Sequence, residues 1–197
     1  MKFLFDLGGV FLDWHPQYFY RNIFKDKKEL NFFLTNVCND AWNLRQDAGR
    51  SIENAEKDLI SKFPNYSKEI KLYYPSHRKM IKRVFESSLN LLSNLKSKKY
   101  KCYVLSNFSA ETFVGMMEEY KFLKKFNGII ISGEEKIVKP DKKIFKLAIQ
   151  RFNLIPQQTI FIDDRLENIN SAKNIGFKTV HLKNPLNIIK QVNILIE

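Results

Sequence analysis

Six polar side chains that could do chemistry stand at the ends of short apolar segments or in the loops between them. They are Asp6 after residues 2–5, Ser106 and Asn107 after residues 101–105, Lys139 in the loop Lys139-Pro140-Asp141, and Asp163 and Asp164 after residues 159–162. The strands of a parallel sheet end at a common edge, and open α/β sheets bind their ligands there. We therefore expect these six side chains to form one site.

Three of the six side chains are carboxylates: Asp6, Asp163 and Asp164. Unpaired carboxylates in one pocket repel one another and raise each other's pKa. A hard divalent cation removes this repulsion, and Mg²⁺ typically takes one or two carboxylates together with phosphate oxygens and waters. The sequence therefore predicts a Mg²⁺ site.

The other groups suit an anion. Lys139 offers a point charge for a phosphate oxygen, and Ser106 offers a hydroxyl. The backbone amides of Asn107 and Gly9 offer further donors, and no side chain on Gly8 or Gly9 shields the latter. Around one free carboxylate, these groups predict phosphoryl transfer with Asp6 as the nucleophile.

Each feature also has a simpler explanation. An aspartate after a strand commonly caps a turn, and a serine followed by an asparagine commonly forms one. Lys139-Pro140-Asp141 fits a loop before a helix, and Asp163-Asp164 fits a helix N-terminus. The order of the four features and their placement at strand ends favour the chemical interpretation.

The elements around these residues alternate between strand and helix patterns. Strands are expected at residues 2–5, 101–106, 129–131, 159–162 and 179–182. Helices are expected at 109–120 after Ser109, from Asp141 to about 152, from about 168 to Gly176, and from Pro185 onward. This alternation predicts an α/β fold, a Rossmann-like parallel sheet with helices on both faces.

Residues 16–83 break this alternation, because their patterns are helical and no strand stands out. Asp26 and Ser51 are expected to cap two helices, and a third is expected over 67–84 with a kink at Pro75. The sequence thus predicts an α/β core of residues 1–14 and 85–197 with an inserted α-helical cap domain at residues 15–84. Candidates for the wall of its substrate pocket are Trp14, Tyr18, Phe19 and Trp42.

These motifs resemble those of the haloacid dehalogenase (HAD) superfamily of hydrolases with a helical cap of the first type. Residues 5–10 resemble the first motif, 105–107 the second, 139–141 with Ile144 and Phe145 the third, and 161–165 with Asn168 the fourth. The resemblance covers nearly the whole chain. Asp6-Leu7-Gly8 and Ser106-Asn107-Phe108 are similar to the subgroup that includes glucose-1-phosphate phosphatases.

The resemblance implies a Mg²⁺-dependent phosphatase that hydrolyses a small phosphate monoester, such as a sugar phosphate, through an aspartyl-phosphate on Asp6. Mg²⁺ would be held by the Asp6 carboxylate, the Gly8 carbonyl and Asp164, with Asp163 binding it directly or through water. Ser106 and Lys139 would hold the phosphoryl oxygens.

One position departs from the superfamily's pattern. Its phosphatases usually carry a second aspartate two residues after the nucleophile, as general acid and base, and here that residue is Gly8. Asp13 and His15 follow within a few residues and are candidates to replace it, although a surface loop is the simpler place for both. A positioned acid or base is worth about 10²–10⁴-fold in rate.

Gly8 keeps two alternatives open. A 2-haloacid dehalogenase of the same superfamily uses the first aspartate as nucleophile and needs neither an acid nor a metal, and Arg45 could bind its carboxylate substrate. A non-catalytic binding or regulatory protein on this fold is the second alternative. Asp163 and Asp164 argue against the first, and retention of Asp6 and Lys139 argues against the second.

The composition sets further limits. The 197 residues carry a net charge of +12, but 7 of the 33 basic residues are Arg and the Lys residues are scattered, so nucleic acid is not the expected partner. A basic field also attracts small phosphate esters. Asp6 interrupts the apolar N-terminus, so we expect no signal peptide. No apolar run approaches the roughly 18 residues of a membrane helix, so we expect no membrane segment. We expect a cytoplasmic protein in which Cys38 and Cys102 are free thiols.

Overall fold

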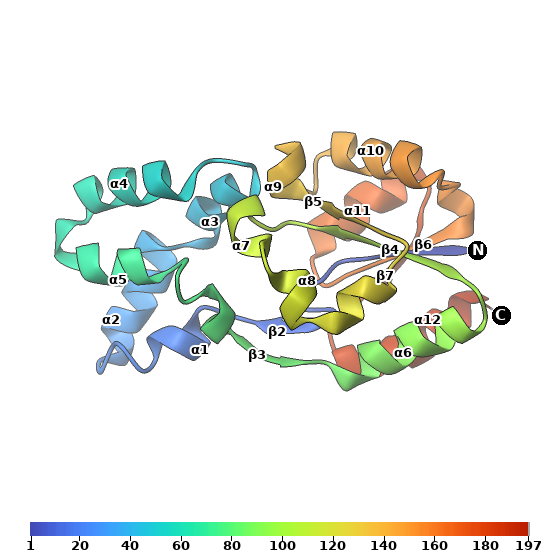
Figure 1. Ribbon diagram of the computed structural model, residues 1–197, viewed down its shortest axis with the longest axis horizontal. Coiled ribbons are helices and arrows are strands. Elements are labelled where there is room, and N and C mark those ends of the chain that lie inside the picture. Colours follow the sequence, from blue (N-terminus) through green and yellow to red (C-terminus); the bar gives the residue numbers. More distant parts are fainter. Residues whose placement is uncertain (197) are drawn as a thin grey trace.

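Strand β1 (Lys2–Phe5) is the middle strand of a five-stranded parallel sheet and leads directly into Asp6. A computed structural model describes residues 1–196 of the chain (Figure 1). The other strands are β4 (Lys101–Ser106), β5 (Gly128–Ile131), β6 (Thr159–Asp163) and β7 (Lys178–His181), in the order β5-β4-β1-β6-β7. Phe5 is paired with Val104 on one side and with Ile162 on the other. The carboxyl ends of β4, β1 and β6 therefore lie next to one another.

Both faces of the sheet are apolar, because successive side chains of a buried strand point to opposite faces. Phe3 and Phe5 lie in a core shared with α6 (Glu86–Ser97) and α12 (Ile188–Ile196). Leu4 lies in a second core, shared with α10 (Lys142–Phe152) and α11 (Leu166–Ile175). Figure 1 shows the two pairs of helices on opposite sides of the sheet. The predicted α/β fold is confirmed.

Shorter helices complete the α/β part of the chain. They are α7 (Ala110–Phe113), α8 (Met116–Glu119), η4 (Lys121–Lys125), α9 (Ser132–Glu135), η5 (Pro156–Gln158) and η6 (Pro185–Asn187). The single helix expected over 109–120 is wrong, because Gly115 adopts a left-handed conformation (φ 81°) that separates α7 from α8. Asp141 caps α10 through the Lys143 N–H, and left-handed Gly176 ends α11, both as predicted.

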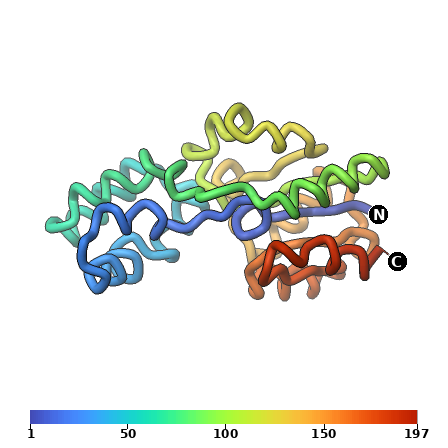
Figure 2. The backbone as a smooth tube through the Cα atoms, turned by 90° about the horizontal axis from the view of Figure 1, so that it is seen from below, coloured from blue at the N-terminus to red at the C-terminus, as the bar shows by residue number. Residues whose placement is uncertain are grey.

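The chain between Trp14 and Ile81 is helical, and we call this segment the insert. Its helices are α1 (Gln17–Tyr20), α2 (Lys27–Phe32), the π-helical η1 (Phe33–Val37), α3 (Asp40–Asp47), α4 (Ile52–Lys62), η2 (Pro64–Tyr66), α5 (Ser67–Leu72) and η3 (His77–Met80). They surround a hydrophobic core of their own, in which Tyr20, Phe33 and Tyr73 are buried. Figures 1 and 2 show the insert at the end of the molecule opposite the two termini, beyond the carboxyl ends of the strands.

A small antiparallel ribbon joins the insert to the sheet. Strand β2 (Leu12–Trp14) leaves the core and β3 (Ile81–Val84) returns to it, with Leu12 opposite Val84 and Trp14 opposite Ile81. The expectation of helix over 67–84 is wrong here, because α5 ends at Leu72 ahead of Pro75, and Ile81 and Val84 suit a strand.

Two expectations from composition can be compared with the structure. Within residues 1–196, every helix is too short or too polar to span a lipid bilayer. Cys38 and Cys102 are buried and free, as predicted.

Candidate active site

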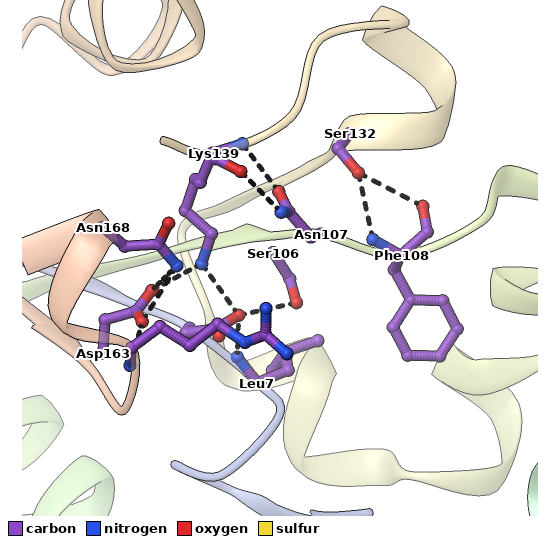
Figure 3. A network of polar contacts seen from close by, with 10 residues as sticks. Leu7, Ser106, Asn107, Phe108, Ser132, Lys139, Asp163 and Asn168 are labelled. Carbon is purple, nitrogen blue, oxygen red and sulfur yellow. Dashed lines mark hydrogen bonds and ion pairs between the residues drawn. The ribbon is translucent and has the colours of Figure 1, made fainter. Parts of the chain in front are cut away.

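The structure brings the six polar side chains together at the carboxyl edge of the sheet, and Figure 3 shows four of them: Ser106, Asn107, Lys139 and Asp163. Ser106 and Asp163 are the last residues of β4 and β6, and Asp6 directly follows β1 between them. Carboxylate oxygens of Asp6, Asp163 and Asp164 all lie within 4.8 Å of one another. These residues lie together because β1 pairs with β4 on one side and with β6 on the other, so the three parallel strands end side by side.

The Asp6 carboxylate is oriented through one of its two oxygens. Oδ1 accepts hydrogen bonds from the Leu7 N–H (2.7 Å) and the Ser106 hydroxyl (2.7 Å), and lies 3.1 Å from the Lys139 ammonium. No group within residues 1–196 donates a hydrogen bond to Oδ2. Burial raises the pKa of Asp6, Lys139 and Ser106 oppose this rise, and Asp163 adds to it. Oδ2 is therefore the oxygen of Asp6 that is left to contact a ligand.

Lys139 is fully buried between two carboxylates. Its Nζ lies 2.7 Å from Asp163 Oδ2 and 3.1 Å from Asp6 Oδ1, and 5.6 Å from the centre of the Phe161 ring. Burial acts to lower the pKa of Lys139, but the charges of Asp163 and Asp6 together outweigh it and raise the pKa. An ammonium has three N–H groups, so two carboxylate contacts leave one for a bound anion.

Asn107 holds the backbone of Lys139 in place. Its Oδ1 accepts the Lys139 N–H at 2.8 Å, and its Nδ2 donates to the Lys139 carbonyl at 2.9 Å. Asn107 is predicted to bind phosphate through its backbone amide. Its side chain has a different role, because it positions the lysine, which otherwise sits on a loop.

Asp163 serves as the buried partner of Lys139. Its Oδ1 accepts from the Arg165 N–H (2.8 Å) and from Asn168 Nδ2 (3.0 Å), and its Oδ2 accepts from Lys139 and again from Asn168 (3.1 Å). Both oxygens are therefore engaged within the chain.

Asp164 is half-buried and faces the other two carboxylates. Burial, with the charges of Asp6 and Asp163, raises the pKa of Asp164 to about 7. A methyl group on Gly9 would lie 2.5 Å from this carboxyl group, and Gly9 has φ +65°, so the close approach requires glycine. The three carboxylates face a single ammonium, and a divalent cation would neutralise the remaining charge. The residues present thus fit a divalent metal.

The prediction for the Gly9 amide is wrong for this structure. The Gly9 N–H donates to the Leu12 carbonyl at 3.0 Å, because the chain turns back on itself between β1 and β2. It is therefore not a free donor for phosphate. The Gly8 carbonyl accepts no hydrogen bond from residues 1–196 and stays available as a ligand.

A cavity of about 270 Å³ lies between this cluster and the helical insert. Its core side is lined by Asp6, Gly8, Gly9, Leu12, Trp14, Asn107, Phe108, Lys139, Asp164, Arg165 and Asn168, and its insert side by His15, Pro16, Asp40, Asn43, Leu44, Asp47 and His77. Sequence analysis missed the insert residues Asp47 and His77. No local pattern marks either residue, since only the tertiary fold places them beside the core.

Several other predicted residues lie away from the cavity. Of the predicted aromatic wall, Trp14 lines it, whereas Tyr18 donates to Asp13 at 2.7 Å and Trp42 packs in the insert core. Phe19 packs partly against that same core. Arg45 is outside the lining.

The two candidates to replace the missing acid differ. Asp13 is engaged by the Tyr18 hydroxyl and by Arg83 (3.0 Å) and does not line the cavity. His15 lines the cavity, is exposed, and accepts the Gln17 N–H at Nδ1.

One family of enzymes matches most of the chain. The profile of the haloacid dehalogenase-like hydrolases matches residues 27–182. The chain belongs to this family. It is a hydrolase, as the resemblance of its motifs implied.

Two relatives of this HAD hydrolase are named for different reactions. Sesquiterpene phosphatase astK of Aspergillus oryzae is 24% identical over 183 residues, which cover 93% of this chain and 90% of that protein. (S)-2-haloacid dehalogenase 4A of Burkholderia cepacia is 26% identical over 98 residues, which cover 50% of this chain and 42% of that protein.

A solved structure shares the fold of this HAD hydrolase. It is a HAD family enzyme of Bacteroides thetaiotaomicron in complex with magnesium and inorganic phosphate. Its TM-score is 0.68 at 24% identity, over 91% of this chain and 92% of that one.

Proposed function

We propose that this HAD hydrolase is a Mg²⁺-dependent phosphatase that acts on a small phosphate monoester through an aspartyl-phosphate at Asp6. The observation that carries the proposal is a cluster of three carboxylates, two of which contact one buried lysine. An anionic ester and a divalent cation fit such a site, whereas a metal-free dehalogenase has no need of the extra carboxylates. The phosphatase relative and the structural neighbour with magnesium and phosphate support this choice.

The reaction begins at Asp6 Oδ2. This oxygen forms a bond to phosphorus while the bond from phosphorus to the ester oxygen breaks, and the leaving oxygen keeps the electron pair and takes a proton. Water then cleaves the bond between Asp6 and phosphorus, which releases phosphate and restores the carboxylate. Asp6 Oδ1 stays fixed by Ser106 and Leu7 throughout, so the nucleophile is already oriented.

Lys139 lets two anions approach each other. Its free N–H can bind a phosphoryl oxygen while the other two remain on Asp6 and Asp163. Because the ammonium is buried and fixed, it can stabilise the charge of the transition state without rearrangement.

The metal would be held by the Asp6 carboxylate, the Gly8 carbonyl and Asp164. The oxygens of Asp163 are already engaged by Lys139 and Asn168, so we assign it contact through water. Bound there, Mg²⁺ would polarise the phosphoryl group and neutralise part of its charge.

We also propose that residues 15–84 act as a cap over a core of residues 1–14 and 85–197. Contacts between the two parts rim the cavity, including Arg165 to Asp40 at 3.0 Å and the Ser132 hydroxyl to the Asp47 carbonyl at 2.6 Å. The cavity of about 270 Å³ is at the small end for ligand sites, which favours a small ester such as a sugar phosphate over a protein or nucleic acid. A sugar phosphate is also the substrate that the likeness to glucose-1-phosphate phosphatases favours.

Removal of divalent cations tests this proposal against the dehalogenase alternative. Chelation with EDTA is expected to reduce hydrolysis of p-nitrophenyl phosphate to background, and added Mg²⁺ to restore it. Turnover of 2-chloropropionate by the chelated protein, without phosphatase activity in Mg²⁺, would contradict the proposal. Absence of both activities would favour the binding-protein alternative.

Mg²⁺ binding should also depend on pH. The pKa of Asp164 is about 7, and a metal ligand must be deprotonated, so affinity should rise about tenfold between pH 6 and pH 8. Calorimetric titration of the full chain with MgCl₂ measures this. Asp164→Asn is the matched control, since it should weaken binding and remove most of the pH dependence.

A further inference from the structure

Proton supply to the leaving group is the unassigned step of the proposed reaction. Gly8 has no side chain, Asp13 is engaged outside the cavity, and His15 is on an exposed loop. An alcohol is a poor leaving group unless it is protonated as its bond to phosphorus breaks. Another group that faces the cavity is therefore required.

Asp47 is a buried carboxylate on the insert side of the cavity. It is the last residue of α3, is 9% exposed, and lines the same cavity as Asp6, Lys139 and Asp164. Asn43 donates to its Oδ2 at 3.2 Å, and the Ser132 hydroxyl donates to its carbonyl at 2.6 Å. The side chain is thus held by a residue of the insert, and the backbone of Asp47 is held by a residue of the core.

The position of Asp47 suits the leaving group. In an in-line displacement the leaving oxygen departs on the side of phosphorus opposite the nucleophile. Asp6 attacks from the sheet edge, and the insert lies beyond that edge, so the leaving oxygen points toward the insert. Asp47 belongs to the wall on that side.

We propose that Asp47 is the general acid and base of this enzyme, in the role that a carboxylate at position 8 would otherwise fill. As an acid, it gives its proton to the ester oxygen as the bond to phosphorus breaks. As the resulting carboxylate, it takes a proton from the water that cleaves the aspartyl-phosphate, which returns it to its starting form. This assignment rests on the proposed phosphatase function.

The electrostatic surroundings of Asp47 fit both halves of this cycle. Burial raises its pKa to about 7, the Ser109 backbone amide and Arg165 oppose the rise, and Asp6 and Asp40 add to it. A group with a pKa near the working pH can both give and accept a proton. The other titratable groups that line the cavity are His15, His77, Lys139 and Asp164.

The dependence on leaving group separates this role from a structural one. Asp47→Asn keeps the size of the side chain but removes its proton. For glycerol phosphate, kcat/KM should fall about 10²–10⁴-fold, whereas for p-nitrophenyl phosphate, whose leaving oxygen is already acidic, it should fall less than about fivefold. An equal loss for both esters would overturn the assignment.

Asp40→Asn is the matched control on the same helix. Asp40 is exposed and pairs with Arg165, so its replacement should change kcat/KM for both esters by the same factor. Hydrolysis of neither ester by the wild-type enzyme with Mg²⁺ would overturn the proposed function itself. Hydrolysis by wild type with a uniform loss in Asp47→Asn overturns only the role of Asp47.

Two further measurements use the same substrates. In the wild type, kcat/KM for glycerol phosphate should fall as the pH rises through about 7, because the acid form of Asp47 is lost. This fall in the pH profile of kcat/KM should be absent in Asp47→Asn. The same fall of kcat/KM with pH in the variant would overturn the assignment.

The second measurement is rescue from position 8. A Cβ on Gly8 meets no atom within 4 Å, so the backbone leaves room for a side chain to start there. Gly8→Asp combined with Asp47→Asn should recover glycerol phosphate hydrolysis by at least about tenfold. Equal recovery for both esters would count against a proton-transfer role.

Discussion

Asp6→Asn is expected to lower kcat/KM for p-nitrophenyl phosphate by at least about 10⁴-fold, the scale of loss when a nucleophile is removed. The amide nitrogen cannot attack phosphorus, whereas the amide oxygen can still accept from Ser106, Leu7 and Lys139. The fold should therefore persist. Steady-state kinetics and urea unfolding measure the two effects, and the free energy of unfolding should change by less than about 1 kcal/mol.

Asp13→Asn is the control for Asp6→Asn. Asp13 is close in sequence but is engaged by Tyr18 and Arg83 outside the cavity. Its replacement should leave kcat/KM within about threefold of wild type. More than about a tenth of wild-type activity in Asp6→Asn would contradict the role of Asp6 as nucleophile.

Lys139→Met should damage both stability and catalysis. Asp163 and most of Asp6 are buried around the ammonium, and removing one partner of a buried ion pair costs about 3–5 kcal/mol. Thermal unfolding should shift down by on the order of 10 °C. Hydrolysis by the folded fraction should fall by about 10²–10³-fold, because a fixed donor to the phosphoryl group is lost.

The loss of stability in Lys139→Met should be smaller at low pH. Burial already raises the pKa of Asp6 above its ordinary value of 3.8, and without the ammonium it rises further. The folded variant then keeps a proton that the unfolded chain has released, so its stability falls as the pH rises from about 4 toward neutrality. Lys142→Met, an exposed lysine in the same stretch, should change stability by less than about 0.5 kcal/mol. Equal effects of the two substitutions would contradict the buried ion-pair network.

The core of the fold could be predicted because its signals are local. Residues 2–5, 101–106 and 159–162 are apolar runs of strand length, and Asp141 and Gly176 mark helix ends by their own chemistry. The ribbon of β2 and β3 could not be predicted in this way. Its strands are short and lie far apart in the sequence, and only their pairing makes them strands.

The site residues also divide into those that local sequence signals reveal and those that only the tertiary fold places. Asp6, Ser106 and Asp163 follow strands that could be predicted, so their convergence could be predicted too. The prediction that the Gly9 N–H donates to phosphate is wrong because this N–H donates to the Leu12 carbonyl, a contact that no spacing reveals. Asp47 could not be predicted because its position at the cavity depends on how the insert packs against the core, which no local sequence pattern reveals.

Trapping the covalent intermediate tests the central claim most directly. The full-length enzyme with Mg²⁺ is mixed with excess p-nitrophenyl phosphate, quenched in acid within the first turnover, digested, and analysed by mass spectrometry. The account predicts the mass of one added phosphoryl group on the peptide that contains Asp6, and no such addition in Asp6→Asn. Hydrolysis of the ester without phosphorylation of Asp6 would contradict it.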